Sequence, residues 1–325
     1  MRVGVIGGGA WGTALAQVAA EGGETLLWAR EPEVVESVNT SHVNALFLPG
    51  IPLNPALRGT ADLDELAQCE ALLVVTPAQH MRSVLASMPR LSAPLTLCAK
   101  GMEEASMKLM HDVAREAQPD APVAVLSGPT FAHEVAAGLP AAVTLAAEDA
   151  ATGERLRARL ARPWFRPYLS DDVVGAEIGG AVKNVLAIAC GVVEGRQLGQ
   201  NARSALISRG FAEMTRFGLA RGARAETLAG LSGLGDLVLT CSSTSSRNFS
   251  LGKGLGEGRN AADLLADRRT VAEGAYTAPV LLRAAGEAGV DMPIVAAVCA
   301  LLAGEASVSE VVERLLARPL RSEGV

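Results

Sequence analysis

The opening of the chain constrains the fold more than any other part of the sequence. Residues 3–6 are a short β-branched run typical of a buried strand, and residues 11–21 have a helical pattern that ends at Gly22 and Gly23. Between them lies GGGAWG, residues 7–12, which has the spacing G-x-G-x-x-G. A glycine turn that leaves a strand and opens a helix is the phosphate-binding turn of a dinucleotide-binding unit. The sequence therefore predicts a parallel, helix-covered sheet that binds a dinucleotide.

Each glycine of this turn has a distinct expected role. Gly7 permits the tight turn, Gly9 permits close approach of a pyrophosphate, and Gly12 lets helix and strand pack closely. The N-terminus of the helix would face the anion. The alternative is a flexible glycine loop without a ligand, which the agreement of strand, motif and helix disfavours.

The end of the second strand, residues 25–29, bears on the choice of cofactor. An acidic residue usually holds the ribose hydroxyls of NAD at this point, whereas an arginine accommodates the 2′-phosphate of NADP. The chain has Arg30 followed by Glu31, so both chemistries are available. The pattern leans towards NADP and leaves NAD open. Arg30 as a solvated surface charge is the remaining alternative.

The pattern of strands and helices divides the chain into two domains. An α/β domain, residues 1–172, is expected to hold a Rossmann-type doubly wound sheet, and an all-α domain is expected over residues 173–325. Residues 231–248, rich in Gly and Ser, are expected to be irregular. The further strands are expected at residues 71–75, 95–99, 123–126, 141–146 and 165–169, with a helix at 151–161 between the last two. The C-terminal helices are expected at residues 177–194, 203–221, 276–288, 293–303 and 307–316.

Composition and charge exclude several classes of protein. A net charge of −6 argues against a nucleic-acid binder, and 49% hydrophobic residues supply a sizeable core. The uncharged run at residues 3–20 imitates a secretion signal, but its glycines make a poor apolar helix, so a cytoplasmic protein is expected. The longest apolar stretch in the C-terminal half is residues 292–303, and it is too short to span a membrane. The scattered cysteines and histidines predict no metal site.

Candidate catalytic residues follow strands or lie in the helical half. Lys100 and Thr130 each follow an expected strand, at the carboxyl end of the sheet where open α/β sheets bind ligands. The alternatives are that Lys100 is simply solvated and that Thr130 belongs to an ordinary turn before a helix. Lys183 lies among small and apolar residues and therefore needs a partner or a function, unless its amine extends to water. Asp236 and Arg247 lie in the irregular stretch, where an arginine is able to grip a phosphate in bidentate fashion.

Taken together, these segments resemble a known family. The stretches GGGAWGTALA, SGPTFAHEV, GGAVKNVLAIACG, LSGLGDLVLTC, SSRNFSLGKGLG and VAEGAYTA are similar to the bacterial NAD(P)-dependent sn-glycerol-3-phosphate dehydrogenases. The matches keep their order from Gly7 to Glu273, so the resemblance covers nearly the whole chain.

The resemblance implies reversible reduction of dihydroxyacetone phosphate to sn-glycerol 3-phosphate with NAD or NADP, for glycerophospholipid synthesis. It also implies a C-terminal domain like that of 6-phosphogluconate dehydrogenase, and a homodimer. Its implied catalytic residues are Lys183, the proton acceptor in oxidation, with Lys100 and Asp236. Its implied substrate-binding residues are Lys100, Gly128, Thr130, Lys183, Asp236, Ser246, Arg247 and Asn248. Its implied cofactor-binding residues are Gly7, Gly9, Trp11, Gly12, Arg30, Lys100, Ala132, Arg247, Val271 and Glu273.

The chain departs from the resemblance at two positions. Thr130 stands where serine is commoner, and it keeps the hydroxyl. Glu31 stands where many relatives have a second basic residue, so the NADP preference is left open.

The expected chemistry needs a lysine that titrates well below its usual range. An unperturbed lysine has a pKa of about 10.4, and burial with the like charge of Lys100 should lower the pKa of Lys183, opposed by Asp236. The expected site lies between the two domains. The alternatives are another two-domain dehydrogenase, such as a ketopantoate or 3-hydroxy acid enzyme, and a non-enzymatic nicotinamide-nucleotide sensor.

Overall fold

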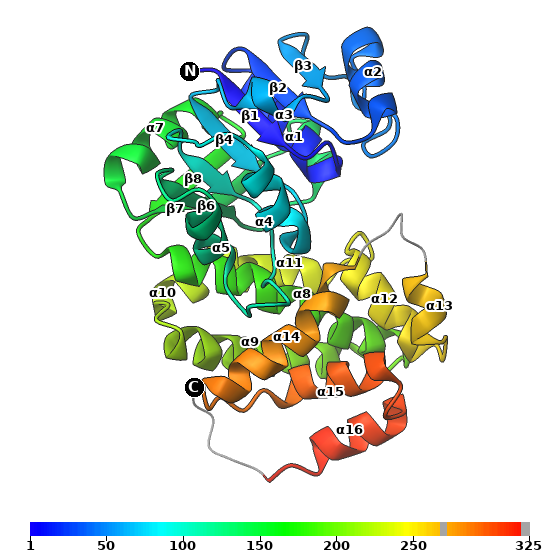
Figure 1. Ribbon diagram of the computed structural model, residues 1–325. Helices are drawn as coiled ribbons and strands as arrows, with labels where there is room; N and C mark the ends of the chain where they lie inside the picture. Colours follow the sequence, from blue (N-terminus) through cyan, green and yellow to red (C-terminus); the bar gives the residue numbers. More distant parts are fainter. Residues whose placement is uncertain (267–271, 320–325) are drawn as a thin grey trace. The chain divides into compact units, whose positions relative to one another are not determined.

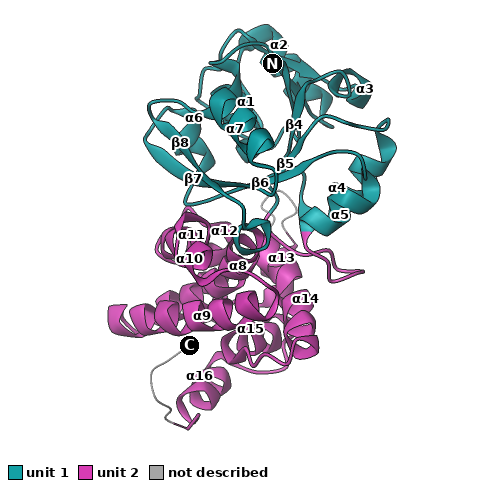
Figure 2. Ribbon diagram, turned by 90° about the vertical axis from the view of Figure 1, so that its left-hand side faces the viewer, with its two compact units in different colours: residues 1–99, 110–176 teal, residues 100–109, 177–325 magenta. Residues whose placement is uncertain are grey.

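A computed structural model describes residues 1–266 and 272–319 of the chain. The chain forms two compact units, drawn in teal and magenta in Figure 2. Unit 1 comprises Met1–Ala99 and Met110–Ala176, and unit 2 comprises Lys100–Leu109 and Glu177–Val325. Lys100 follows a strand of the sheet in unit 1, yet its segment is grouped with the helical unit.

Unit 1 is built on one eight-stranded sheet (Figure 1). Its order is β3-β2-β1-β4-β5-β6-β7-β8, and all neighbouring strands are parallel except β6 and β7. The strand order reverses beside β1, which pairs with β2 on one side and β4 on the other. This is the switch point at which doubly wound sheets bind ligands. The strands are β1 (Val3–Ile6), β2 (Thr25–Trp28), β3 (Leu57–Thr60), β4 (Ala71–Val74), β5 (Leu95–Leu97), β6 (Val123–Ser127), β7 (Ala141–Ala147) and β8 (Phe165–Ser170).

Helices cover both faces of the sheet, and a separate cluster of buried side chains lies against each face. One cluster takes side chains from α1, α2, α6 and α7, and the other from α3, α4 and α5. The expected doubly wound α/β architecture is therefore confirmed. The helices of unit 1 are α1 (Ala10–Ala20), α2 (Pro32–Ser41), α3 (Leu63–Leu66), α4 (Ala78–Ser87), α5 (Met110–Ala117), α6 (Ala132–Ala136) and α7 (Ala150–Leu160).

Unit 2 is helical, as expected, and α8 (Val173–Gly195) runs through its core. By length and composition α8 is apolar enough to cross a membrane, but 94% of the relevant window is buried, as in a core helix. Residues 292–303 are still the longest uninterrupted apolar run of this half, because Lys183 and Asn184 interrupt α8. The other helices are α9 (Gln200–Ala220), α10 (Ala225–Leu228), α11 (Asp236–Cys241), α12 (Arg247–Gly256), α13 (Ala261–Leu265), α14 (Glu273–Glu287), α15 (Pro293–Ala303) and α16 (Val308–Leu316).

The stretch expected to be irregular, residues 231–248, is mostly helical. A π-helical turn, Leu231–Gly235, leads directly into α11, and α12 begins at Arg247. The prediction failed because the glycines there serve close packing. A Cβ at Gly233 would lie 1.9 Å from the carbonyl oxygen of Leu228, so only glycine lets the turn tighten.

Candidate active site

A buried cluster of charged residues in unit 2 is built around Lys183. The Lys183 side chain extends from α8, and the residue is only 6% exposed. Its Nζ donates to Oδ1 of Asp236 at 2.6 Å and to Oγ1 of Thr240 at 2.8 Å. The alternative that Lys183 extends its amine to water is therefore wrong.

The carboxylate of Asp236 bridges two lysines. Asp236 is fully buried, and its second oxygen accepts from Nζ of Lys100 at 2.6 Å. One negative charge thus holds two ammonium groups in one buried place, which leaves the cluster with a net positive charge when both lysines are protonated. Lys100 and Asp236 are separated by 136 positions in the sequence.

Glycine packing explains how Asp236 reaches Lys183. A Cβ at Gly179, on α8, would lie 2.3 Å from the carbonyl oxygen of Ser232. The absence of a side chain at Gly179 lets the π-helical turn lie directly against α8, and α11 then starts at Asp236. Thr240 lies one helical turn after Asp236, on the same face of α11, so both side chains meet the lysine.

The electrostatics of the cluster lower the pKa of Lys183 to about 8, from an ordinary value of 10.5. Burial is the largest cause, because the ammonium form loses its hydration. The charge of Asp236 opposes this shift and the like charge of Lys100 adds to it. The direction and the three causes are those expected from the sequence. A lysine with such a pKa exchanges a proton near neutral pH.

Thr240 is the member of this cluster that sequence reasoning missed. Its hydroxyl accepts a hydrogen bond from Nζ of Lys183 and donates one to Oδ1 of Asp236 at 3.3 Å. The available signal was the i, i+4 spacing from Asp236, which is informative only if residues 236–241 are read as a helix.

A pair of asparagines connects this cluster to other predicted site residues. Asn184 donates to the carbonyl oxygen of Lys100 at 3.4 Å and accepts from Nδ2 of Asn248 at 3.0 Å. The amide nitrogen of Gly274 donates to Oδ1 of Asn248 at 2.9 Å. Asn248, expected as a substrate ligand, is therefore bonded to protein groups through both ends of its side-chain amide.

The N-termini of α12 and α14 carry the remaining predicted residues of unit 2. Ser246 caps α12, its Oγ accepting from the amide of Phe249 at 3.2 Å, and the exposed Arg247 is the first residue of that helix. Glu273 begins α14, and burial raises the pKa of its carboxyl, opposed by the charges of Arg247, Lys100 and Lys183. Val271 lies outside the described residues.

The glycine turn of unit 1 has the conformation that its sequence requires. Gly7 has a φ of +126°, and a Cβ there would lie 2.9 Å from the carbonyl oxygen of Val75. A Cβ at Gly12 would lie 1.8 Å from the carbonyl oxygen of Gly7. Gly9 differs, because a Cβ there meets nothing within 4 Å. No side chain caps α1 at Gly9, so the helix N-terminus is left for another acceptor.

The other unit 1 residues predicted to contact ligands lie at carboxyl ends of strands. Arg30 follows β2, its side chain is 80% exposed, and it pairs with Glu31 at 3.0 Å. Thr130 lies between β6 and α6, and its hydroxyl donates to the carbonyl oxygen of Gly128 at 3.3 Å. Ala132 is the first residue of α6. On α1, the buried Nε1 of Trp11 has no hydrogen-bond partner.

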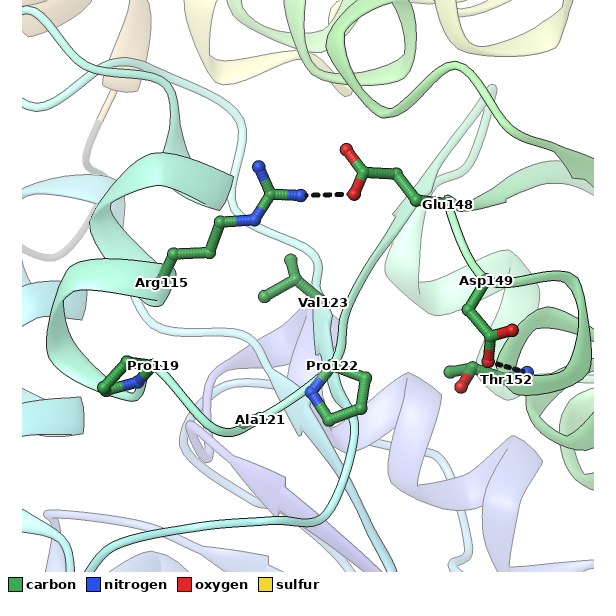
Figure 3. A pocket seen from close by; sticks show the side chains of 8 residues that line it. All are labelled: Arg115, Pro119, Ala121, Pro122, Val123, Glu148, Asp149 and Thr152. Carbon is green, nitrogen blue, oxygen red and sulfur yellow. Dashed lines mark hydrogen bonds and ion pairs between the residues drawn. The ribbon is translucent and has the colours of Figure 1, made fainter.

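A separate cavity of about 350 Å³ lies at the amino end of β6, the edge of the sheet opposite the glycine turn (Figure 3). Arg115 and Glu148 pair across it at 2.7 Å, and Asp149 caps α7 by accepting from the amide of Thr152 at 2.8 Å. Pro119, Ala121, Pro122 and Val123 complete the lining. None of the predicted site residues lines this cavity.

The fold and these two sets of residues define a class of enzyme. A doubly wound sheet with a glycine turn at its switch point is typical of nicotinamide-dinucleotide dehydrogenases. A buried lysine with a lowered pKa, held by a carboxylate, has the chemistry of an acid–base group.

Comparisons with known proteins identify the family. The model of the NAD-dependent glycerol-3-phosphate dehydrogenase N-terminus matches residues 2–153, and that of the C-terminus matches residues 172–313. The chain belongs to the NAD(P)-dependent glycerol-3-phosphate dehydrogenase family, and the resemblance seen in the sequence is confirmed.

Individual relatives agree with this assignment along the whole chain. Glycerol-3-phosphate dehydrogenase [NAD(P)+] of Erythrobacter litoralis is 66% identical over 323 residues, which are 99% of this chain and 98% of the relative. The crystal structure of glycerol-3-phosphate dehydrogenase from Coxiella burnetii is 36% identical with a TM-score of 0.93, covering 98% of this chain and 99% of that one. A ketopantoate reductase of Ralstonia eutropha, 15% identical with a TM-score of 0.57 over 97% of this chain and all of that one, shares the fold alone.

Proposed function

We propose that this chain reversibly reduces dihydroxyacetone phosphate to sn-glycerol 3-phosphate with NAD(P)H, and so supplies the backbone of glycerophospholipids. The observation that carries the proposal is the buried amine of Lys183, bonded to Asp236 and Thr240, with a pKa of about 8. A nucleotide sensor has no need for an acid–base group of this kind.

The glycine turn fits the phosphates of a dinucleotide. The space beside Gly9 is open, the N-terminus of α1 lacks a side-chain cap, and Trp11 has an unpartnered buried Nε1. Gly9 would face the pyrophosphate, in a turn that Gly7 and Gly12 shape. Further cofactor contacts would come from Trp11, Arg30, Ala132 and Val271. The cofactor, when bound, supplies a hydride to the carbonyl carbon or accepts one from the alcohol carbon.

The acid–base role falls to Lys183. As an ammonium it would donate a hydrogen bond to the substrate oxygen that gains negative charge, and then give it a proton from Nζ. In oxidation the neutral amine would take the proton from the alcohol. Asp236 and Thr240 would aim the amine, because both accept from Nζ.

Binding energy far from the reacting carbon would come from the substrate phosphate. Arg247 is an exposed arginine at the first position of α12, where its guanidinium and the helix N-terminus both favour an anion. Lys100, Ser246, Asn248, Gly128 and Thr130 would add hydrogen bonds to substrate, and Lys100, Arg247 and Glu273 would also contact the cofactor. Residues 1–172 would supply the dinucleotide-binding turn, and residues 173–325 would supply Lys183 and Arg247, which act on the substrate.

The assay that tests the proposal mixes purified protein with NADPH or NADH and dihydroxyacetone phosphate. Loss of the absorbance of the reduced nicotinamide is expected, with either or both cofactors. Ketopantoate serves as the control substrate, and turnover of ketopantoate alone would favour the other dehydrogenase. Cofactor binding without any turnover would favour the sensor.

Two further properties complete the proposal. The protein would be cytoplasmic, as the glycines in the run at residues 3–20 suggest, and a homodimer, as the family resemblance suggests. Light scattering of the purified protein in solution measures the mass, and a monomeric mass would contradict the dimer. Fractionation of cells that produce the protein measures the location.

A further inference from the structure

A fully buried asparagine outside the sequence motifs, Asn44, is bonded to the glycine turn. Its Nδ2 donates to the carbonyl oxygen of Gly8 at 2.8 Å and to Oγ1 of Thr13 at 2.7 Å. Its Oδ1 accepts from the amide of Phe47 at 3.0 Å, which fixes the orientation of the side-chain amide. Thr13 donates in turn to the same carbonyl of Gly8 at 3.4 Å.

The segment that carries Asn44 is attached to α1 at a second point. The amide of Asn54 donates to Oε1 of Gln17 at 2.7 Å. Gln17 lies one helical turn after Thr13, so both contacts lie on the same face of α1. The segment that carries Asn44 is therefore held against α1 at two points, Asn44 and Asn54.

The hydrogen bond to Gly8 has a consequence for the next amide. In a trans peptide the C=O of one residue and the N–H of the next point in opposite directions. With the carbonyl of Gly8 directed at Asn44 in the interior, the N–H of Gly9 points the other way. That is the side on which Gly9 has open space.

Two successive glycines give this peptide unusual freedom. Neither Gly8 nor Gly9 has a Cβ to restrict its backbone, so the peptide between them is able to rotate at low cost. Rotation would turn a carbonyl oxygen, instead of an N–H, towards an anion at the turn. A bond from a fully buried donor opposes that rotation, because breaking it would leave one N–H of the buried Asn44 amide without an acceptor.

We propose that Asn44, assisted by Thr13, is a positioning residue that holds the Gly8–Gly9 peptide with its N–H directed at the pyrophosphate of the cofactor. The inference rests on the proposed cofactor-binding role of the turn. Asn44 itself touches neither cofactor nor substrate in this arrangement, and acts through the backbone of Gly8.

The test replaces Asn44 by an apolar residue of similar size, N44L, and measures direct binding of NADPH and NADH by fluorescence titration. A lost hydrogen bond to a charged group corresponds to roughly a tenfold or greater rise in Kd. We expect that rise for N44L and a smaller one for T13V. Inorganic pyrophosphate should displace NADPH from the unaltered protein at lower concentration than from N44L. The kcat at saturating cofactor and the KM for dihydroxyacetone phosphate should change by less than about threefold, because the peptide acts on binding alone.

Asn39 provides the matched control. It also holds a glycine peptide of unit 1, with Nδ2 donating to the carbonyl of Gly59 at 3.0 Å and Oδ1 accepting from the amide of Gly59 at 2.8 Å. N39L should therefore leave the cofactor Kd unchanged. An unchanged Kd in both N44L and T13V, or an equal rise in N39L, would overturn the inference. If N44L does not fold, T13V carries the test alone. Failure of the unaltered protein to bind either cofactor would instead contradict the proposed function.

Discussion

The glycine turn of unit 1 and the lysine cluster of unit 2 are built from different chemical groups. The glycine turn of unit 1 uses backbone amides, a helix N-terminus and the absence of side chains at Gly7, Gly9 and Gly12. The lysine cluster of unit 2 uses charged side chains from segments that are far apart in sequence, such as Lys100 and Asp236. The turn is local in sequence and carries no formal charge. The cluster depends on folding to bring its charges together.

The two regions therefore control different properties, the geometry of binding in one and the pKa of a side chain in the other. A backbone site fixes geometry, and a side-chain substitution alters it only by filling space or by releasing a peptide. A charged cluster fixes a pKa, and each of its members changes the proton affinity of the others. Variants of the cluster should therefore act on kcat and its pH dependence, and variants of the turn on cofactor binding.

The largest expected effect comes from removing the amine. K183M should lower kcat in both directions on the order of 10³-fold, because general acid–base catalysis by a placed group is worth that much. Steady-state assays measure kcat, and titration with NADPH measures cofactor binding, which should be unaffected. Normal turnover with intact substrate binding would break the comparison by removing the acid–base role from Lys183.

A smaller loss is expected from removing the phosphate contact. R247A should lower kcat/KM for dihydroxyacetone phosphate by about 10²-fold, as the loss of charge-assisted hydrogen bonds implies. Unphosphorylated dihydroxyacetone should be affected far less, since it has no phosphate to anchor. Equal losses with the two substrates would show that Arg247 does not bind the phosphate.

Two alanine substitutions separate packing from binding within the turn. G9A places a Cβ in open space at a φ of −68°, so the protein should keep its Tm while its Kd for NADPH rises about tenfold through crowding of the phosphates. G12A places a Cβ 1.8 Å from a backbone oxygen, so its Tm should fall as well. Thermal melts and NADPH titrations measure both properties. A G9A variant that binds cofactor normally would contradict the placement of the pyrophosphate.

The smallest expected effect is a change of a few-fold in rate as the pH passes through the pKa of Lys183. Because the pKa of Lys183 is about 8, the ammonium form needed for reduction is lost as the pH rises through that value. The kcat of reduction should therefore fall above pH 8, and that of oxidation should rise. K100M removes a like charge, so both midpoints should move to higher pH, although the total rate also falls. Midpoints that stay in place would show that the observed titration belongs to another group.

Much of the fold was predictable because its signals are local. The strand at Val3–Ile6 and the helix after it follow from adjacent patterns, and most later strands were placed to within a residue or two. The strand Leu57–Thr60 was missed because Arg58 and Gly59 interrupt its apolar pattern. The antiparallel pairing of β6 and β7 was not predicted, because the direction of a strand depends on the connection before it and not on the residues of the strand itself.

Individual residues of the candidate site were predictable from the sequence, but the hydrogen bonds between them were not. Lys183 was conspicuous as a charge among apolar residues, but its bond to Thr240 depends on a helix that the glycines of residues 231–235 concealed. Asn44 carried no signal at all, since an isolated asparagine in a loop is ordinary. Contacts over long sequence separations are decided by packing, which a local pattern does not encode.

The segment Lys100–Leu109 has a consequence for how the protein is synthesised. Two of its partners are encoded much later: Asp236 accepts from Lys100, and Arg283 donates to the carbonyl oxygen of Glu104 across 179 positions. While a ribosome is still translating the middle of the message, these two contacts have not yet formed. Cutting the gene near codon 172 would therefore yield two fragments that are each incomplete, and their activity would return only when both are present together.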